Sequence, residues 1–117
     1  MGQLTTHVLD IMNGCPAAGM AVELHRLQGD AATRLMTFAL NADGRADAPL
    51  LDGAAFAAGR YRLVFDVAGY FRARGVALPE PPFIGRVTLD FGIAEPHAHY
   101  HVPLLASPWA YSTYRGS

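Results

Sequence analysis

Alternation of apolar and polar residues with a period of two runs through most of the chain, and it predicts β-strands. The clearest case is residues 60–67, where apolar side chains occupy every second position. Alternation or enrichment in β-branched and apolar residues predicts further strands over residues 4–11, 20–27, 33–40, 86–93, 99–106 and 109–115. In the first of these strands, one face carries Thr5, His7, Leu9 and Ile11.

Turn signals separate these segments. Residues 28–30 (Gln-Gly-Asp) suit a hairpin, and residues 41–45 contain Asp-Gly, which supplies the positive φ of a tight turn. Residues 50–58 are alanine-rich and fit a short strand or a turn, while residues 69–75 are bounded by glycines and fit a short helix. The pattern of about seven or eight short strands predicts an all-β protein, either an antiparallel sandwich of two sheets or a small barrel.

Length and composition narrow the class of protein. The 117 residues form one expected domain, 1–117, and 51% of them are hydrophobic against 16% charged, which is typical of a globular protein. A net charge of −1 without a basic run argues against a nucleic-acid partner. The absence of an apolar stretch of about 20 residues argues against a membrane span. A single cysteine, Cys15, and the lack of a signal-peptide pattern predict a cytoplasmic protein.

Three histidines alternate at positions 97, 99 and 101, so a straight strand would place them on one face with successive Cβ atoms about 6.5–7 Å apart. Three imidazoles on one face suit zinc, although the outer two lie far apart on a straight strand. His97 also fits the turn before the strand, whereas His101 leads into an apolar run and needs a partner. His7 lies in mid-strand. The residues alone are compatible with a purely structural role, as a buried histidine hydrogen-bonded to a backbone carbonyl or a threonine.

Other chemistries find little support. The chain has no glycine-rich phosphate loop and no Gly-x-Ser-x-Gly motif, and nothing in the sequence lowers the pKa of Cys15. Arg45 reads as a solvated loop residue, and Asp10 and Asp66 read as solvent-facing or turn carboxylates. Residues 111–117 (YSTYRGS) are unusual, because they are dense in aromatic, hydroxyl and guanidinium groups, as the wall of a site is.

Several of these segments together resemble one family, the transthyretin-like 5-hydroxyisourate hydrolases of purine catabolism. The resemblance rests on residues 4–10 (LTTHVLD), 41–45 (NADGR), 99–105 (HYHVPLL), 107–108 (SP) and 111–117 (YSTYRGS). The terminal Tyr-Arg-Gly-Ser is the most specific of these, since it separates the hydrolases from the hormone carrier transthyretin. The similarity is weakest over residues 50–58 and 75–86.

The resemblance implies a transthyretin-like sandwich of two four-stranded sheets with one short helix within residues 68–74. It also implies a homotetramer with its sites in a channel at the dimer–dimer interface. The implied catalytic residues are His7, Arg45, His101 and Ser117. The implied substrate-binding residues are His7, Arg45, His99, Tyr114, Arg115 and Ser117.

The implied reaction is hydrolysis of the N1–C6 amide of 5-hydroxyisourate to 2-oxo-4-hydroxy-4-carboxy-5-ureidoimidazoline in urate degradation. A histidine suits the general base and arginine suits a developing oxyanion. Ser117 would orient a histidine or the substrate through its hydroxyl or a terminal carboxylate, and the resemblance implies no metal and no cofactor. Two alternatives remain at this point: a carrier that uses the same channel without chemistry, and a zinc-dependent hydrolase that uses His97, His99 and His101.

Overall fold

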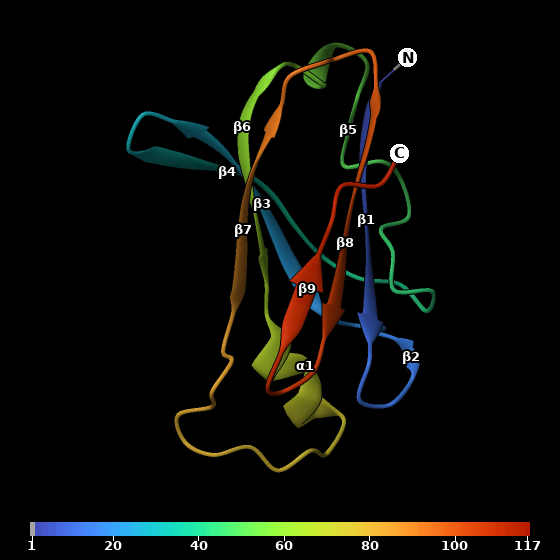
Figure 1. Cartoon of the computed structure of the whole chain (residues 1–117), viewed down its shortest axis with the longest axis vertical. Helices are drawn as coiled ribbons and strands as arrows, with labels where there is room; N and C mark the ends of the chain where they lie inside the picture. The colour runs from blue at the N-terminus through green and yellow to red at the C-terminus, as the bar shows by residue number, and fades with distance from the viewer. Residues whose placement is uncertain (1) are drawn as a thin grey trace.

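The computed structural model describes residues 2–117, and it arranges the strands in two sheets packed face to face (Figure 1). The elements in chain order are β1 (Gln3–Asp10), β2 (Cys15–Pro16), β3 (Ala21–Gln28), β4 (Ala31–Ala39), β5 (Leu51–Asp52), a 3-10 turn η1 (Gly53–Ala55), β6 (Gly59–Phe65), α1 (Val67–Ala73), β7 (Val87–Ile93), β8 (His99–Ala106) and β9 (Tyr111–Thr113).

One sheet has the strand order β4-β3-β6-β7 and is antiparallel throughout. The other has the order β2-β1-β8-β9, and β5 adds a fifth short strand by pairing with the start of β1. The expected sandwich is therefore confirmed, with one addition to the second sheet. Within this sheet β1 and β8 run parallel, and partners such as His7 and Pro103 lie 96 positions apart in the chain.

The core lies between the sheets and is built from alternate residues of each strand. Tyr61, Leu63 and Phe65 of β6 are at most 1% exposed, and they belong to the same cluster as Leu4 and Val8 of β1. On β1 it is thus the even-numbered positions that face the core. The odd-numbered positions, which include Thr5 and His7, lie on the outer face of the sheet.

Asp10 corrects one expectation, because it is fully buried and does not face solvent. Its carboxylate accepts hydrogen bonds from the backbone N–H groups of Met12 and Asn13, from Asn13 Nδ2 at 2.7 Å and from the Tyr70 hydroxyl at 2.8 Å. Burial favours the neutral acid, but these hydrogen bonds outweigh it and hold the pKa of Asp10 below its ordinary value. The Asp10 carboxylate can be buried on the core-facing side of β1 because these hydrogen bonds satisfy its oxygens.

The predicted short helix is confirmed as α1. Asp66 precedes it as its N-cap and accepts a hydrogen bond from the Gly69 N–H at 3.1 Å. Through Tyr70 the helix docks against the end of β1, beneath the sheets in Figure 1. Among residues 2–117, no helix has the length and apolar character needed to cross a bilayer.

Candidate active site

The parallel pairing of β1 with β8 brings together histidines from opposite ends of the chain. Thr5 lies directly opposite His101, and Gln3 lies opposite His99. Partners in adjacent strands project to the same face, so Thr5, His7, His99 and His101 gather on the outer face of the sheet. All four are half-buried.

Arg45 reaches this face through the turn that the Asp-Gly sequence predicts. Gly44 has a φ of +72°, and a Cβ there would lie 2.6 Å from the Val8 carbonyl oxygen, so only glycine fits. The Gly44 carbonyl accepts a hydrogen bond from the Val8 N–H at 2.9 Å, and the backbone of Arg45 forms an antiparallel bridge with His7. Asn41 Oδ1 accepts hydrogen bonds from the N–H groups of Asp43 and Arg45, which fixes the turn.

Residues 111–117 approach from the opposite side of β8, and Figure 1 shows this last segment in red alongside β8. Gly116 pairs with His101 through two backbone hydrogen bonds of 3.1 and 2.7 Å. A Cβ on Gly116 would lie only 3.2 Å from both Cβ and Cδ2 of His101. Glycine at this position therefore leaves room for the imidazole. Ser117 follows directly and is exposed.

The Thr5 hydroxyl contacts both histidines of β8. Its Oγ1 lies 2.8 Å from His101 Nδ1 and 3.1 Å from His99 Nε2. Neither bond could be foreseen from the sequence, because each joins residues more than 90 positions apart.

Burial and the nearby guanidinium lower the pKa of the two central histidines. For His101, burial is the largest cause, followed by the positive charge of Arg45 and the charges that His7 and His99 carry when protonated. For His7, burial and Arg45 also lower the pKa, against the opposing effects of a backbone hydrogen bond and the charge at Asp43. At neutral pH both imidazoles are therefore neutral and able to accept a proton, beside a permanent cation. A neutral base next to a cation is suited to activating water and stabilising an oxyanion.

The structure separates Tyr114 and Arg115 from this cluster. The Arg115 guanidinium carbon lies 4.3 Å from the centre of the Tyr100 ring, and Arg115 Nη2 donates a hydrogen bond to the His99 carbonyl at 3.1 Å. Together with Thr113, both residues line a pocket of about 440 Å³ that lies between β7 and the β8–β9 strands. Arg115 thus contacts the backbone of β8, and its guanidinium packs on the core side of the sheet.

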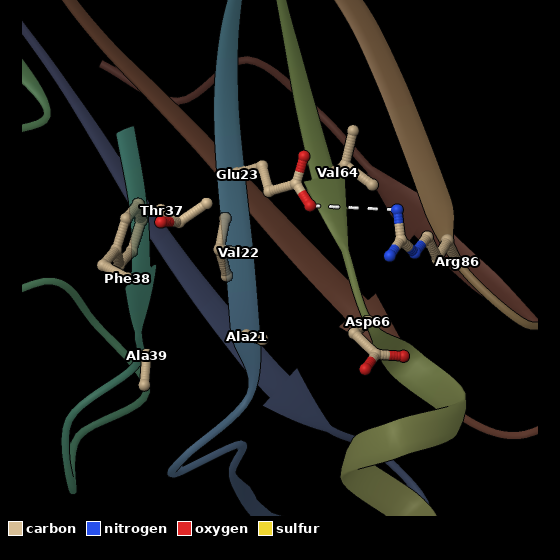
Figure 2. Close-up of a pocket in the computed structure, with 9 residues that line it drawn as sticks. All are labelled: Ala21, Val22, Glu23, Thr37, Phe38, Ala39, Val64, Asp66 and Arg86. Carbon is tan, nitrogen blue, oxygen red and sulfur yellow. Dashed lines mark ion pairs between the residues drawn. The ribbon is translucent and has the colours of Figure 1, made fainter. Parts of the chain in front are cut away.

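Two further hollows differ in their relation to the cluster. One of about 250 Å³ is lined by Thr5, Arg45 and residues 46–49, and so adjoins the histidines. Another of about 330 Å³, shown in Figure 2, lies on the other sheet. It holds the ion pair between Glu23 and Arg86 at 3.8 Å, and none of the expected site residues lines it.

The geometry does not support a zinc site formed by the three alternating histidines. Within residues 2–117, no group of three or more His, Cys, Asp or Glu side chains is placed to bind a metal ion. His97 is exposed in the loop before β8, and its backbone N–H donates to Glu95 Oε1.

Comparison with known proteins agrees with this arrangement. Residues 4–116 match the model of the HIUase/Transthyretin family. The chain is 57% identical to 5-hydroxyisourate hydrolase 2 of Rhizobium meliloti (strain 1021), over 99% of this chain and 97% of the relative. A solved structure of Klebsiella pneumoniae 5-hydroxyisourate hydrolase superposes with a TM-score of 0.81 at 38% identity, with both chains fully covered.

A structure of (S)-allantoin synthase superposes with a TM-score of 0.94 at 47% identity over 99% of this chain. This chain spans only 44% of the length of that one. The full-length matches, the sandwich and the family-model match together establish that the chain belongs to the HIUase/Transthyretin family.

Proposed function

We propose that this protein is an enzyme that hydrolyses 5-hydroxyisourate, the substrate named for its full-length relatives. One observation carries the proposal: two histidines of lowered pKa and one arginine converge on the outer face of the β1–β8 pair. A carrier has no need of a neutral base next to a cation. Hydrolysis of a cyclic amide needs both.

In the proposed mechanism His101 is the general base. Thr5 engages its Nδ1, which leaves Nε2 to take a proton from water. The water oxygen bonds to C6 while the carbonyl electron pair moves to oxygen, next to the Arg45 guanidinium. Collapse of this intermediate breaks the C6–N1 bond, and N1 takes the proton from His101 Nε2. Water has then been added across the amide, with no cofactor.

The other expected residues have supporting roles in this proposal. His7, on the same face, holds the substrate or the water, and the Ser117 hydroxyl orients a histidine or the substrate. His99 adjoins the base through Thr5. Tyr114 and Arg115 act indirectly, since Arg115 holds the β8 backbone at His99 and does not reach the histidine rings.

A homotetramer with sites at the dimer–dimer interface completes the proposal. The histidines of the cluster are only half-buried in a single chain, and β7 and β9 are edge strands. Large aromatic side chains around β9 are exposed, with Trp109 at 59%, Tyr111 at 48% and Tyr114 at 60%. We expect light scattering to give a mass four times the 12.6 kDa of the chain. A monomer at micromolar concentration would contradict this part of the proposal.

We also infer that the chain acts as one domain in the cytoplasm. Both sheets share a single core cluster, and the one cysteine, Cys15, is free.

The function is tested by the decay of 5-hydroxyisourate generated from urate by urate oxidase. We expect wild-type protein to accelerate the decay and His101→Asn to lose about 10²–10⁴-fold in kcat. His97→Asn is a matched control, because His97 is exposed outside the cluster, and it should retain full activity. No acceleration by wild type would favour the carrier. Activity lost with a chelator and restored by zinc, together with sensitivity to His97→Asn, would favour the zinc hydrolase.

A further inference from the structure

We propose that Thr5 is a positioning residue for His101: its single hydroxyl links His101 to His99 and sets which ring nitrogen of His101 carries a proton. The inference rests on the proposed function, in which His101 is the base. In this inference Thr5, a residue of β1, acts on the reaction through His101 and makes no direct contact with the reacting atoms.

The geometry is that of a bridge across two strands. Thr5 lies opposite His101 in the parallel β1–β8 register and diagonal to His99. Its Oγ1 lies 2.8 Å from His101 Nδ1 and 3.1 Å from His99 Nε2, and both distances are typical of hydrogen bonds. Among the residues that the structure describes, Thr5 is the one whose side chain is hydrogen-bonded to the His101 ring.

A count of protons restricts this bridge to three arrangements when both histidines are neutral, because the Thr5 oxygen also has two lone pairs that can accept. A hydroxyl has one hydrogen to donate, and a neutral imidazole has one N–H and one bare nitrogen. In the first arrangement His101 Nδ1–H donates to Thr5, and Thr5 donates to a bare His99 Nε2. In the second, His99 Nε2–H donates to Thr5, and Thr5 donates to a bare His101 Nδ1. In the third, His101 Nδ1–H and His99 Nε2–H both donate to the two lone pairs of the Thr5 oxygen.

The first and third arrangements produce a base at the position that the mechanism needs. With the proton on Nδ1, the Nε2 of His101 is bare and can accept a proton from water. When it does so, the Nδ1–H remains bonded to Thr5, so the ring keeps its orientation through the step. The second arrangement places the proton on Nε2 and leaves no base there.

The remaining groups around His101 do not perform this task. Arg45, His7 and His99 face it with positive or potentially positive charge, which disfavours the imidazolium without selecting a tautomer. Gly116, on the other side, has no side chain and contributes only backbone hydrogen bonds to the His101 backbone. The selection of the tautomer therefore falls to the Thr5 hydroxyl.

The test compares Thr5→Val with Thr5→Ser. Valine removes the hydroxyl with little change of shape, whereas serine keeps it. Thr6→Val is a matched control, because Thr6 is the next residue of β1 and its hydroxyl donates to the Val102 carbonyl at 2.7 Å on the core side. Circular dichroism and thermal melting verify that each variant folds.

We expect Thr5→Val to lower kcat about tenfold with little change in KM, since one hydrogen bond that orients the base is lost. Thr5→Ser should restore most of the activity, and Thr6→Val should leave kcat close to that of the wild type. Nitrogen-15 NMR of the imidazoles, at a pH where both rings are neutral, should show His101 protonated at Nδ1 in the wild type and in Thr5→Ser, and a mixture of tautomers in Thr5→Val.

Two results would overturn the proposal: an unchanged kcat in Thr5→Val, or a wild-type spectrum with His101 protonated at Nε2. The failure of the proposed function is distinct from both, because it would appear as a wild-type protein that does not hydrolyse 5-hydroxyisourate. The NMR comparison does not depend on activity, and so it would still decide whether Thr5 sets the tautomer.

Discussion

Replacement of Gly116 by alanine should impair catalysis without destabilising the fold. The added Cβ would lie 3.2 Å from both Cβ and Cδ2 of His101, whereas ordinary carbon contacts are about 3.5–4.0 Å. The imidazole must therefore move by roughly 0.3–0.8 Å. Because a misplacement of about 1 Å costs on the order of 10²-fold in rate, we expect kcat to fall about three- to thirtyfold.

The stability of Gly116→Ala should stay close to that of the wild type even though its activity falls. Gly116 does not adopt a positive φ, so alanine fits its backbone, and restriction of the unfolded chain contributes about 0.4–1 kcal/mol of stability that offsets the tight contact. Gly92→Ala is the matched control: Gly92 lies in β7, and a Cβ there would meet nothing within 4 Å.

The assay is steady-state hydrolysis of 5-hydroxyisourate by both variants, with thermal melting measured in parallel. Gly116→Ala should lose kcat at an unchanged melting temperature, while Gly92→Ala should match the wild type in both. Equal kcat in the two variants, or a loss of activity that only tracks unfolding, would refute the reasoning that Gly116 makes room for the base.

Three further predictions concern charge and the buried carboxylate. Burial and the charge of Arg45 both lower the pKa of His101. Arg45→Leu should therefore move the acid limb of the pH profile of kcat/KM to higher pH, whereas Arg45→Lys should leave it in place. An acid limb at the same pH in the two variants would contradict this. The pKa values of His7 and His101 lie below their unfolded value of about 6.5, so their contribution to stability is complete above that pH and is lost as the pH falls through 6.5 toward the folded values. In urea titrations between pH 7.5 and 5, His101→Asn should lose less stability than the wild type, and an equal loss would exclude His101 as a cause. Tyr70→Phe removes a hydrogen-bond donor to the buried Asp10 carboxylate and should lower the free energy of unfolding by about 1.5–3 kcal/mol. Tyr111→Phe, at an exposed tyrosine, is the control and should leave the stability unchanged. Equal stability of the two variants would contradict this.

Much of the fold could be predicted because the alternation of apolar residues is local information. The long strands and α1 were predicted within a few residues, but β2 was not, since a two-residue strand carries no period. The side of β1 that faces the core was harder to predict, because Leu4 and Val8 alternate with His7 and Leu9, so both faces contain apolar residues. The burial of Asp10 depends on Tyr70, 60 positions further along the chain.

The candidate site divides in the same way. The turn that carries Arg45 has a local signal in Asp-Gly, and the resemblance pointed to His7, His101 and Ser117. The role of Thr5 had no such signal, because it depends on the parallel pairing of β1 with β8. The sequence already suggested that His97 lies in the turn before the strand, but the contacts of Thr5 with His99 and His101 are visible only in the structure.

The most direct test of the account is the value of kcat/KM for 5-hydroxyisourate at neutral pH, measured by the absorbance of freshly generated substrate. The account predicts that the decay rate rises in proportion to the concentration of wild-type protein, with kcat/KM of at least about 10⁴ M⁻¹s⁻¹. It predicts almost no such rise with His101→Asn. A decay rate that does not depend on the wild-type protein, or one that His101→Asn raises equally, would contradict the account.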